Sequence, residues 1–474
     1  MTAEMRLPLK SLHAIIVAFV FISGCQTLPS YVKQPLAENG ELYLYLQPLP
    51  QEADRLSFAL AGISATNKDG SDFPLMLELK DLRGSDAQRQ RFLAVGRLPA
   101  GDYTGISFKV NKATLKTEDG EASLAIPESA VRTDVSFTVN KKKALLITLT
   151  LNYKNSLRDE VKFSPLFSTK IPGKPVPGLV GYVSNYADNS LTVVDKQSML
   201  VTGIIATGRG PKGMAFDQLR RKAYVAISEE DAIEVVDIPT GEVLNRISLN
   251  TGDNPQELAL SPDGRTLVST NAGTNSVSII DPVSFFETGR VNVGDGPSSI
   301  LIDPTGKRAY VFNTLANTIS VIDLSKRAIV STIVTEPWPV RGQFNRSGDA
   351  LYVIQRLSSY LTVLNPASLV VTKRKYIGTG ANAVKVDSNT DQIYVGKQYE
   401  PWLAVYDPFS FLPGDSIKAG SDNAYLTIDG EGNNLCVVDA GRKSLLFINL
   451  VSRKVVGEID VGEAPYWVSL MGER

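Results

Sequence analysis

The chain of 474 residues has one histidine, His13, and two cysteines, Cys25 and Cys436. His13 lies in a segment that we expect to be removed, so the mature protein would contain no imidazole. This excludes histidine-dependent catalytic triads, histidine-ligated zinc or copper, and a histidine axial ligand to haem. A Cys-x-x-Cys-His motif is also missing, which excludes covalently bound c-type haem.

An excess of either charge is lacking too. The sequence has 49 basic and 50 acidic residues and a formal charge of -1. No overall basic field would draw the chain to nucleic acid, and we expect no nucleic-acid partner. The composition, 43% hydrophobic and 21% charged, is that of a globular protein, and the length predicts more than one folded unit.

The first 24 residues have the pattern of an export signal. Arg6 and Lys10 precede an apolar stretch over residues 12–22, which is shorter than the roughly 20 residues that a membrane span needs. The stretch ends in Phe-Ile-Ser-Gly-Cys at residues 21–25 and resembles a bacterial lipobox, in which the cysteine receives diacylglycerol. The resemblance implies a signal peptide over 1–24, lipidation of Cys25 and a tether over 25–40. The alternative is an ordinary signal peptide with a chance cysteine.

Lipidation would determine where the protein resides. The several acyl chains of a bacterial lipoprotein anchor it stably to a membrane, whereas one chain binds only marginally. Gln26 follows the cysteine, and in the Gram-negative sorting pattern an aspartate there means retention in the inner membrane. The resemblance therefore favours an exported protein of the outer membrane, and leaves the periplasmic or surface leaflet open.

Residues 41–169 alternate apolar and polar side chains in short runs, as in residues 42–46 and 145–151. Period-two runs between turn signals, such as residues 68–70, predict an antiparallel β-sandwich. The segments 98–103 and 106–110 resemble an element of prealbumin-like or immunoglobulin-like modules. Residues 170–178 are rich in proline and glycine and are interpreted as a linker.

The remaining sequence, 179–474, contains seven copies of one unit. The residues of a first column recur at intervals of 42, 44, 42, 42, 42 and 42 positions, and all but one are followed by valine. They are Tyr182, Tyr224, Val268, Tyr310, Tyr352, Tyr394 and Cys436. A second column, thirteen residues later, is Asp195, Asp237, Asp281, Asp323, Asn365, Asp407 and Asn449. A third is usually glycine with proline three residues on, as in Gly208 and Pro211.

A period near 40 with about four β-runs in each copy is typical of a propeller blade. In the third copy the strands are predicted over residues 257–261, 266–270, 276–280 and 288–293, here termed strands a to d. The two extra residues of the longer interval lie between Asp237 and Gly252, and we expect them to lengthen one c-to-d hairpin.

These columns resemble the YVTN family of β-propellers over residues 179–474. The chain enters at a strand b, and residues 465–470 are a lone strand a. We therefore expect residues 465–470 to pair with 181–185 and to close a seven-bladed ring. The predicted fold class is all-β, a β-sandwich followed by this propeller.

A binding site is expected at the mouth of the central channel, where the d-to-a and b-to-c loops share a face. Side chains vary between copies two residues after the proline column and at the end of strand b, and variation within a repeat marks candidate function. The candidates are Glu257, Arg341, Lys397, Tyr425, Asp439 and Trp467. The alternative is structural: Glu257 pairs with Arg341 or Lys397, and the asparagines cap strands.

The other reactive side chains have structural interpretations. The aspartates of the second column are expected to accept backbone N–H bonds in turns rather than to bind calcium. Cys436 replaces the aromatic residue of its column and is expected to be a buried, inert thiol. No metal or cofactor site is predicted, and calcium or a quinone is not excluded.

Two functions remain open. The first is a non-catalytic, lipid-anchored binding or scaffold protein of the cell envelope whose propeller face docks a protein or glycan partner. The second is an enzyme or redox protein, because some propellers that resemble this one are lactonases or hold redox cofactors. Without histidine, that chemistry would need carboxylates such as Glu257 and Asp439 with a bound metal, or a quinone held by Trp467 and Arg341.

The lipid anchor has a direct test. Cys25→Ser should release the protein from membranes because the acyl chains can no longer be attached, and cell fractionation measures the shift. Unchanged membrane retention would refute lipidation at Cys25.

Overall fold

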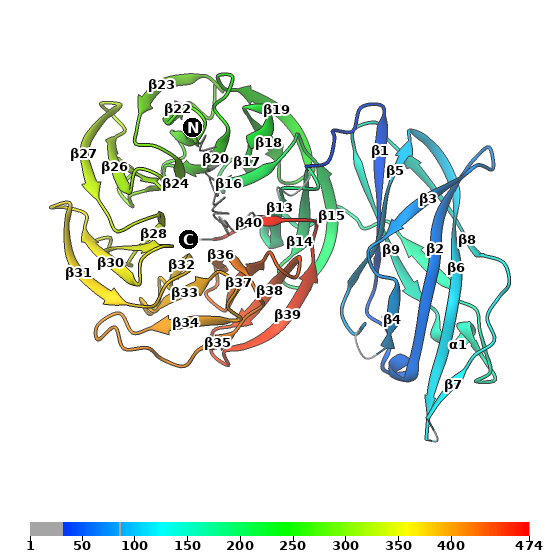
Figure 1. Ribbon diagram of the computed structural model, residues 1–474. Coiled ribbons are helices and arrows are strands. Elements are labelled where there is room, and N and C mark those ends of the chain that lie inside the picture. The colour runs from blue at the N-terminus through cyan, green and yellow to red at the C-terminus, as the bar shows by residue number, and fades with distance from the viewer. Residues whose placement is uncertain (1–31, 85–86, 119, 474) are drawn as a thin grey trace, which may run out of the picture. The chain divides into compact units, whose positions relative to one another are not determined.

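The computed structural model describes residues 32–84, 87–118 and 120–473 (Figure 1). The predicted signal peptide and Cys25 lie outside the described residues. Within the described ranges, no helix is both long and apolar enough to cross a bilayer. The fold is nearly all β, which confirms the predicted class.

The N-terminal part is one ten-stranded sheet in the order β12-β9-β1-β5-β3-β2-β6-β7, with β4 on β2 and β8 on β6. Its strands are β1 (Asn39–Leu46), β2 (Leu56–Asn67), β3 (Asp72–Leu77), β4 (Asp81–Arg83), β5 (Arg91–Pro99), β6 (Gly101–Thr117), β7 (Gly120–Ser123), β8 (Val131–Val139), β9 (Ala144–Leu151) and β12 (Phe167–Lys170). Short elements complete it: η1 (Gln51–Arg55), α1 (Tyr153–Ser156), β10 (Leu157–Arg158) and β11 (Lys162–Phe163).

This sheet curls over a single apolar core. The first residues of β3 pair with β2 and its last two residues pair with β5, so β3 joins the two halves. Buried side chains from both halves, among them Leu44, Ile147, Phe58 and Phe108, form one cluster between them. The strands are not all antiparallel as the alternating pattern predicted, because β1 and β9 run parallel.

The C-terminal part is a propeller of seven four-stranded sheets, six of which are continuous in sequence. The first three are β16 (Pro211–Asp217), β17 (Lys222–Ile227), β18 (Ala232–Asp237) and β19 (Glu242–Ser248); β20 (Pro255–Leu260), β21 (Leu267–Asn271), β22 (Ser276–Ile280) and β23 (Glu287–Asn292); and β24 (Pro297–Ile302), β25 (Arg308–Asn313), β26 (Thr318–Asp323) and β27 (Ala328–Val334). The next three are β28 (Pro339–Phe344), β29 (Leu351–Gln355), β30 (Tyr360–Asn365) and β31 (Val370–Tyr376); β32 (Ala381–Val386), β33 (Ile393–Lys397), β34 (Trp402–Tyr406) and β35 (Ile417–Lys418); and β36 (Asn423–Ile428), β37 (Asn434–Asp439), β38 (Ser444–Asn449) and β39 (Lys454–Asp460).

The seventh blade is assembled from both ends of the propeller. β40 (Pro465–Leu470) supplies strand a, and β13 (Val180–Asn185), β14 (Ser190–Asp195) and β15 (Leu200–Ala206) supply strands b to d. β13 and β40 pair antiparallel from Gly181 opposite Leu470 to Asn185 opposite Pro465. Figure 1 shows β40, in red, beside the green β13 and β14. The predicted closure is confirmed.

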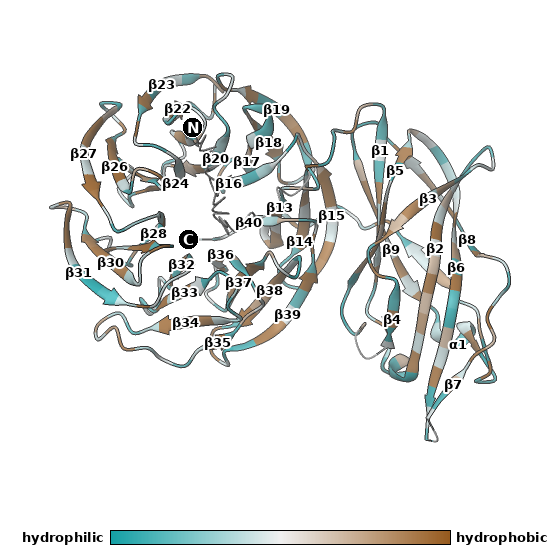
Figure 2. Cartoon of the chain, in the orientation of Figure 1, coloured by the Kyte–Doolittle hydropathy of each residue, from teal (hydrophilic) through white to brown (hydrophobic). Residues whose placement is uncertain are grey.

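The repeat columns correspond to repeated contacts. Tyr182, Tyr224 and Tyr310 of the first column are fully buried, and hydrophobic residues follow the strands of every blade (Figure 2). Cys436 takes the same position, is a free thiol and is fully buried, as predicted. Burial raises the pKa of the Cys436 thiol well above its usual value, which keeps it protonated.

The second column ends strand c with a turn. The carboxylate of Asp195 accepts the backbone N–H groups of Gln197 and Ser198 at 2.9 and 2.8 Å. Each other copy accepts at least one such bond in its turn: Asp237, Asp281, Asp323, Asn365, Asp407 and Asn449. The predicted scaffold role of this column is confirmed.

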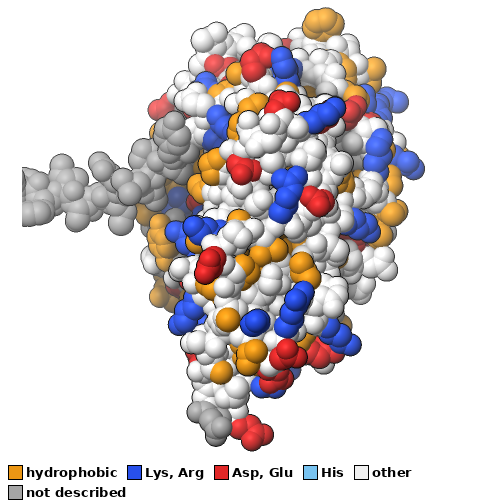
Figure 3. Space-filling model, turned by 90° about the vertical axis from the view of Figure 1, so that its right-hand side faces the viewer, with side chains coloured by type: hydrophobic (Ala, Val, Ile, Leu, Met, Phe, Trp, Pro, Cys, Tyr) orange, Lys and Arg blue, Asp and Glu red, His pale blue; other side chains and the backbone are white. Residues whose placement is uncertain are grey.

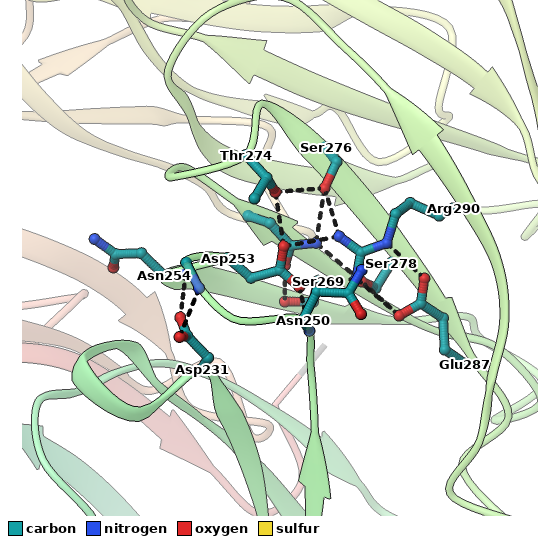
Figure 4. Close-up of polar contacts among 12 residues, drawn as sticks. Asp231, Asn250, Asp253, Asn254, Ser269, Thr274, Ser276, Ser278, Glu287 and Arg290 are labelled. Atoms are coloured by element: carbon teal, nitrogen blue, oxygen red, sulfur yellow. Dashed lines mark hydrogen bonds and ion pairs between the residues drawn. The ribbon is translucent and has the colours of Figure 1, made fainter.

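The two extra residues of the long repeat lie between Asp237 and Gly252, as predicted, but in the d-to-a loop and not in the c-to-d hairpin. Strand d ends eleven residues after the column aspartate in β19 and in β23 alike, so the c-to-d hairpin keeps its length and the d-to-a loop is longer. That loop is held by Asp253, whose buried carboxylate accepts from Arg290 at 2.7 and 2.8 Å and from Thr274 at 2.7 Å (Figure 4). A longer loop needs its own polar partners, which Arg290 and Asp231 supply.

The N-terminal sheet packs on the blade that closes the ring. Tyr43, Tyr45 and Phe92 share an apolar cluster with Val194 and Val201. Asp460, at the end of β39, accepts from Arg91 Nε at 2.9 Å and from the backbone N–H of Phe92 at 3.0 Å. The two parts therefore share one apolar cluster, which is distinct from the core inside the sheet.

Closure of the ring predicts unequal effects of two similar substitutions. Val468→Asp, in β40, places an unpaired charge at a fully buried position and should destabilise the protein by about 4 kcal/mol or more. Val451→Asp, at a position that is 92% exposed, is the matched control and should change stability by less than about 0.5 kcal/mol. Urea unfolding measures both, and equal effects would contradict closure by β40.

Candidate functional site

The d-to-a and b-to-c loops lie together on one face of the ring. In several blades the backbone N–H of a b-to-c loop residue donates to a d-to-a loop carbonyl: Ser228 to Gly210, Thr314 to Gly296 and Arg356 to Trp338. We call this surface the mouth face. Strand a of every blade begins here and is the innermost strand, so its side chains line the channel (Figure 1).

Four of the six candidate residues meet in the channel. Glu257 of β20 and Arg341 of β28 form an ion pair. The guanidinium carbon of Arg341 lies 4.7 Å from the ring centre of Tyr425 and 4.9 Å from that of Trp467. The two rings stack at 3.8 Å, so Arg341 is held by one carboxylate and two aromatic faces.

This cluster is withdrawn from solvent. Glu257 is 1% exposed and Arg341 is 9% exposed. Burial raises the pKa of Glu257, and the neighbouring guanidinium of Arg341 opposes that rise. A buried charge depends on its partner, because removing one member leaves the other uncompensated.

Two cavities meet at the ion pair. One, of about 560 Å³, opens among the loops of the mouth face, and its lining includes Tyr186, Leu315 and Trp338. The other, of about 340 Å³, reaches the a-to-b turns and includes Asp303 and Gln343 in its lining. Glu257 and Arg341 line both cavities, so the pair separates them. We call the larger one the mouth cavity.

Lys212 brings a second cation to the mouth cavity, and the sequence did not single it out. Its Nζ donates to Gln256 Oε1 at 2.6 Å and lies 5.1 Å from the ring centre of Tyr186 and 5.9 Å from that of Tyr466. Burial lowers the pKa of Lys212 to about 8, against the opposing effect of Glu229 and Glu257. Lys212 therefore carries most of its charge at pH 7 and loses it above pH 8.

Arg356 is the third cation of the mouth cavity. One Nη atom donates to Asn382 Oδ1, while the buried Nε has no hydrogen-bond partner. Burial lowers the pKa of Arg356, but a guanidinium stays protonated at neutral pH. The cavity lining thus holds three cations and one carboxylate, that of Glu257.

The other two candidates do not join this cluster. Lys397 pairs with Glu400 in its own b-to-c loop. Asp439 is fully buried and accepts the backbone N–H groups of Ser421 and Asp422 at 2.9 and 3.0 Å. Neither belongs to the lining of the two cavities. At the same position of other blades, Asn185, Asn271 and Asn313 donate to hydroxyls of strand c, so this column caps the b-to-c turn.

An apolar surface borders the mouth on three consecutive blades. Leu315, Leu357 and Tyr399 occupy one repeat position in the b-to-c loops and are 61%, 62% and 67% exposed. Tyr360 and Trp402, also exposed, begin the strands that follow the second and third of these loops. We call these five residues the apolar crescent. Trp338 lines the mouth cavity beside it.

On the face of the N-terminal sheet that Figure 3 presents, basic and acidic side chains are interspersed. In the part of the chain that the structure describes, no group of three or more His, Cys, Asp and Glu residues is placed to hold a metal ion.

Comparison with known proteins identifies the family. The model of the YNCE-like β-propellers matches residues 176–473. The chain belongs to this family. No curated protein matches its sequence.

Solved structures share the fold of this YNCE-like propeller. They include hydrazine synthase of Kuenenia stuttgartiensis, at 18% identity and a TM-score of 0.53, covering 59% of this chain and 96% of that one. A functionally unknown protein from Desulfotomaculum acetoxidans has 12% identity, a TM-score of 0.55, and coverage of 61% and 98%. The dihydro-heme d1 dehydrogenase NirN has 13% identity, a TM-score of 0.51, and coverage of 64% and 78%. At these identities the likeness concerns the fold alone.

A β-bulge explains why Lys212 was missed. The pairing register shifts at the mouth end of strand a in every blade, as between Pro211 and Met214. A bulge turns two successive side chains toward one side, so the residue directly after the proline column also faces the mouth. Six of the seven residues in that column line the mouth cavity: Lys212, Ser298, Val340, Asn382, Ala424 and Tyr466.

Because Glu257 and Arg341 depend on each other, the losses of stability caused by substituting each of them should not add in the double variant. Glu257→Met or Arg341→Met alone should destabilise the protein by about 3–5 kcal/mol, because each leaves a buried charge unpaired. The double variant should be within about 2 kcal/mol of the wild type. Arg132→Met, which breaks an exposed pair with Asp134, is the control and should cost less than about 1 kcal/mol. Denaturant unfolding measures the four variants, and additive losses would rule out the coupling.

Proposed function

We propose that this YNCE-like propeller, of YVTN type, is a non-catalytic binding protein of the cell envelope that docks a protein partner on its mouth face. The observation that carries the proposal is the apolar crescent beside a cationic cavity. Exposed apolar side chains at one repeat position of three consecutive blades lie on the same face of the ring, in neighbouring loops. Exposed apolar surface of this kind marks interaction sites.

The chemistry of the crescent favours a protein over a glycan. Leu315 and Leu357 offer no hydrogen bonds to sugar hydroxyls, although Tyr399 and Trp402 could stack on sugar rings. Aliphatic and aromatic side chains together suit the apolar side chains of a polypeptide. Charge complementarity also requires an acidic group on the partner, because the cavity lining has three cations, Lys212, Arg341 and Arg356, and one carboxylate, that of Glu257. The partner segment is therefore apolar with an acidic residue.

Export and anchoring complete the proposal. Lipidation at Cys25, with the outer membrane favoured, would hold the protein at a membrane surface. In sequence, the predicted domain 41–169 and the linker 170–178 separate Cys25 from the propeller. Their proposed role is that of a spacer that presents the mouth face to its partner.

The enzymatic alternative has weaker support. One form of it needs Glu257 and Asp439 to act with a bound metal, yet Glu257 is paired with Arg341 and Asp439 accepts backbone N–H groups of the d-to-a loop. The other form needs Trp467 and Arg341 to hold a quinone, yet these two side chains pack against each other and against Tyr425. The two carboxylates also share no cavity. The structural neighbours that are enzymes resemble the fold only.

Site-specific crosslinking in cells tests the docking surface. A photoreactive amino acid at position 357 should give a defined protein adduct, whereas the same group at position 451, exposed in a c-to-d turn away from the mouth, should not. The yield at 357 should fall at least tenfold with Leu315→Ser and Tyr399→Ser together, because the partner loses two apolar contacts. Val334→Ser, which alters an exposed strand-d residue, should leave the yield unchanged.

Several outcomes would contradict this function. One is equal labelling at positions 357 and 451. Another is a protease-resistant adduct that proves to be a glycan. A third is an adduct whose yield does not change with the two serine substitutions.

A further inference from the structure

We propose that the mouth cavity is a carboxylate site, in which Lys212 and Arg356 bind one carboxylate carried on an apolar or aromatic body. This inference rests on the proposed function, since the carboxylate would be the acidic anchor of the docked partner. It adds the chemical class of the ligand and the side chains that recognise it.

Two donors are available for a carboxylate. Arg356 uses an Nη atom on Asn382, and its Nε is buried with no partner. A buried donor without a partner is destabilising, so the protein leaves the Arg356 guanidinium incompletely satisfied. Guanidinium N–H groups match the geometry of a carboxylate, and the ammonium of Lys212 supplies a second charge-assisted bond. Arg341, the third cation, is already engaged by Glu257 and two aromatic rings.

The rest of the lining describes the body of the ligand. Leu315, Trp338, Val340 and Ala424 give the cavity an apolar wall, and Ser298, Thr314 and Asn382 add a few polar groups. A volume of about 560 Å³ lies in the usual range of small-ligand sites. Glu257 at the base would repel a second negative charge. A monoanion with an aromatic or aliphatic body fits this lining better than a phosphate dianion.

Calorimetry with a small probe tests the site. Benzoate should bind the purified full chain saturably, and benzamide, the neutral isostere, should bind at least tenfold more weakly. Lys212→Gln and Arg356→Gln should each lower the affinity for benzoate about tenfold, because each removes one charge-assisted bond. Arg265→Gln removes the same charge at a position on an a-to-b turn and should leave the affinity unchanged. Inorganic phosphate should bind more weakly than benzoate.

A pH series on the wild type needs no variant and so is independent of folding defects. Lys212 faces Tyr186 and Glu229 on one side, and Tyr466 and Glu257 on the other. Burial raises the pKa of both tyrosines, which therefore stay neutral as Lys212 titrates near pH 8. Affinity for benzoate should accordingly fall between pH 7 and pH 9.

Failure of this inference differs from failure of the proposed function. Equal binding of benzoate and benzamide, wild-type affinity in Arg356→Gln, or a flat pH series would overturn the carboxylate site. The result of crosslinking at position 357 is independent of these measurements, because it depends on the apolar crescent and not on Lys212 or Arg356.

Discussion

The hydrogen bonds between β13 and β40 join the first strand of the propeller to the last. They complete the seventh blade, so that its strand b is covered on the inner side by a strand a, as in the other six blades. They also build the channel, because β40 carries Tyr466 and Trp467 and the chain after β13 carries Tyr186. Without β40 in place, Lys212 would lose its contact with Tyr466 and Arg341 would lose its contact with Trp467.

The mouth combines features that a scaffold alone does not require. The buried Glu257–Arg341 pair divides the channel, and Lys212 and Arg356 remain as cations on the outer side. The apolar crescent occupies only three of the seven b-to-c loops, while the same repeat position holds Ala187, Glu229, Gly273 and Gly441 in the others. Folding of the blades is compatible with all these residues. The apolar side chains at this position in three consecutive blades are therefore explained better by contact with another molecule than by folding.

Repetition explains what the sequence could predict. Seven copies in register determined the blades, the closing strand and the turn role of Asp195 and its equivalents. They also led to Glu257, Arg341, Tyr425 and Trp467, because alternation along strand a is regular beyond its start. Lys212 was not predicted because the bulge at the start of strand a breaks the alternation of side chains. Lys397 and Asp439 do not join the cluster because a side chain at a strand end can turn toward loops instead of the channel. Lys397 pairs with Glu400 of its own loop, and Asp439 accepts backbone N–H groups of its own loop and of the d-to-a loop.

Native-state hydrogen exchange of the β13 and β40 amides tests ring closure, on which the mouth depends, most directly. If the two strands close the ring, the amides of Gly181–Asn185 and Val468–Leu470 exchange together, with the same free energy of opening as the central strand β21. If the amides of β40 exchange orders of magnitude faster than those of β21, the ring is open at this blade and the mouth described here does not persist.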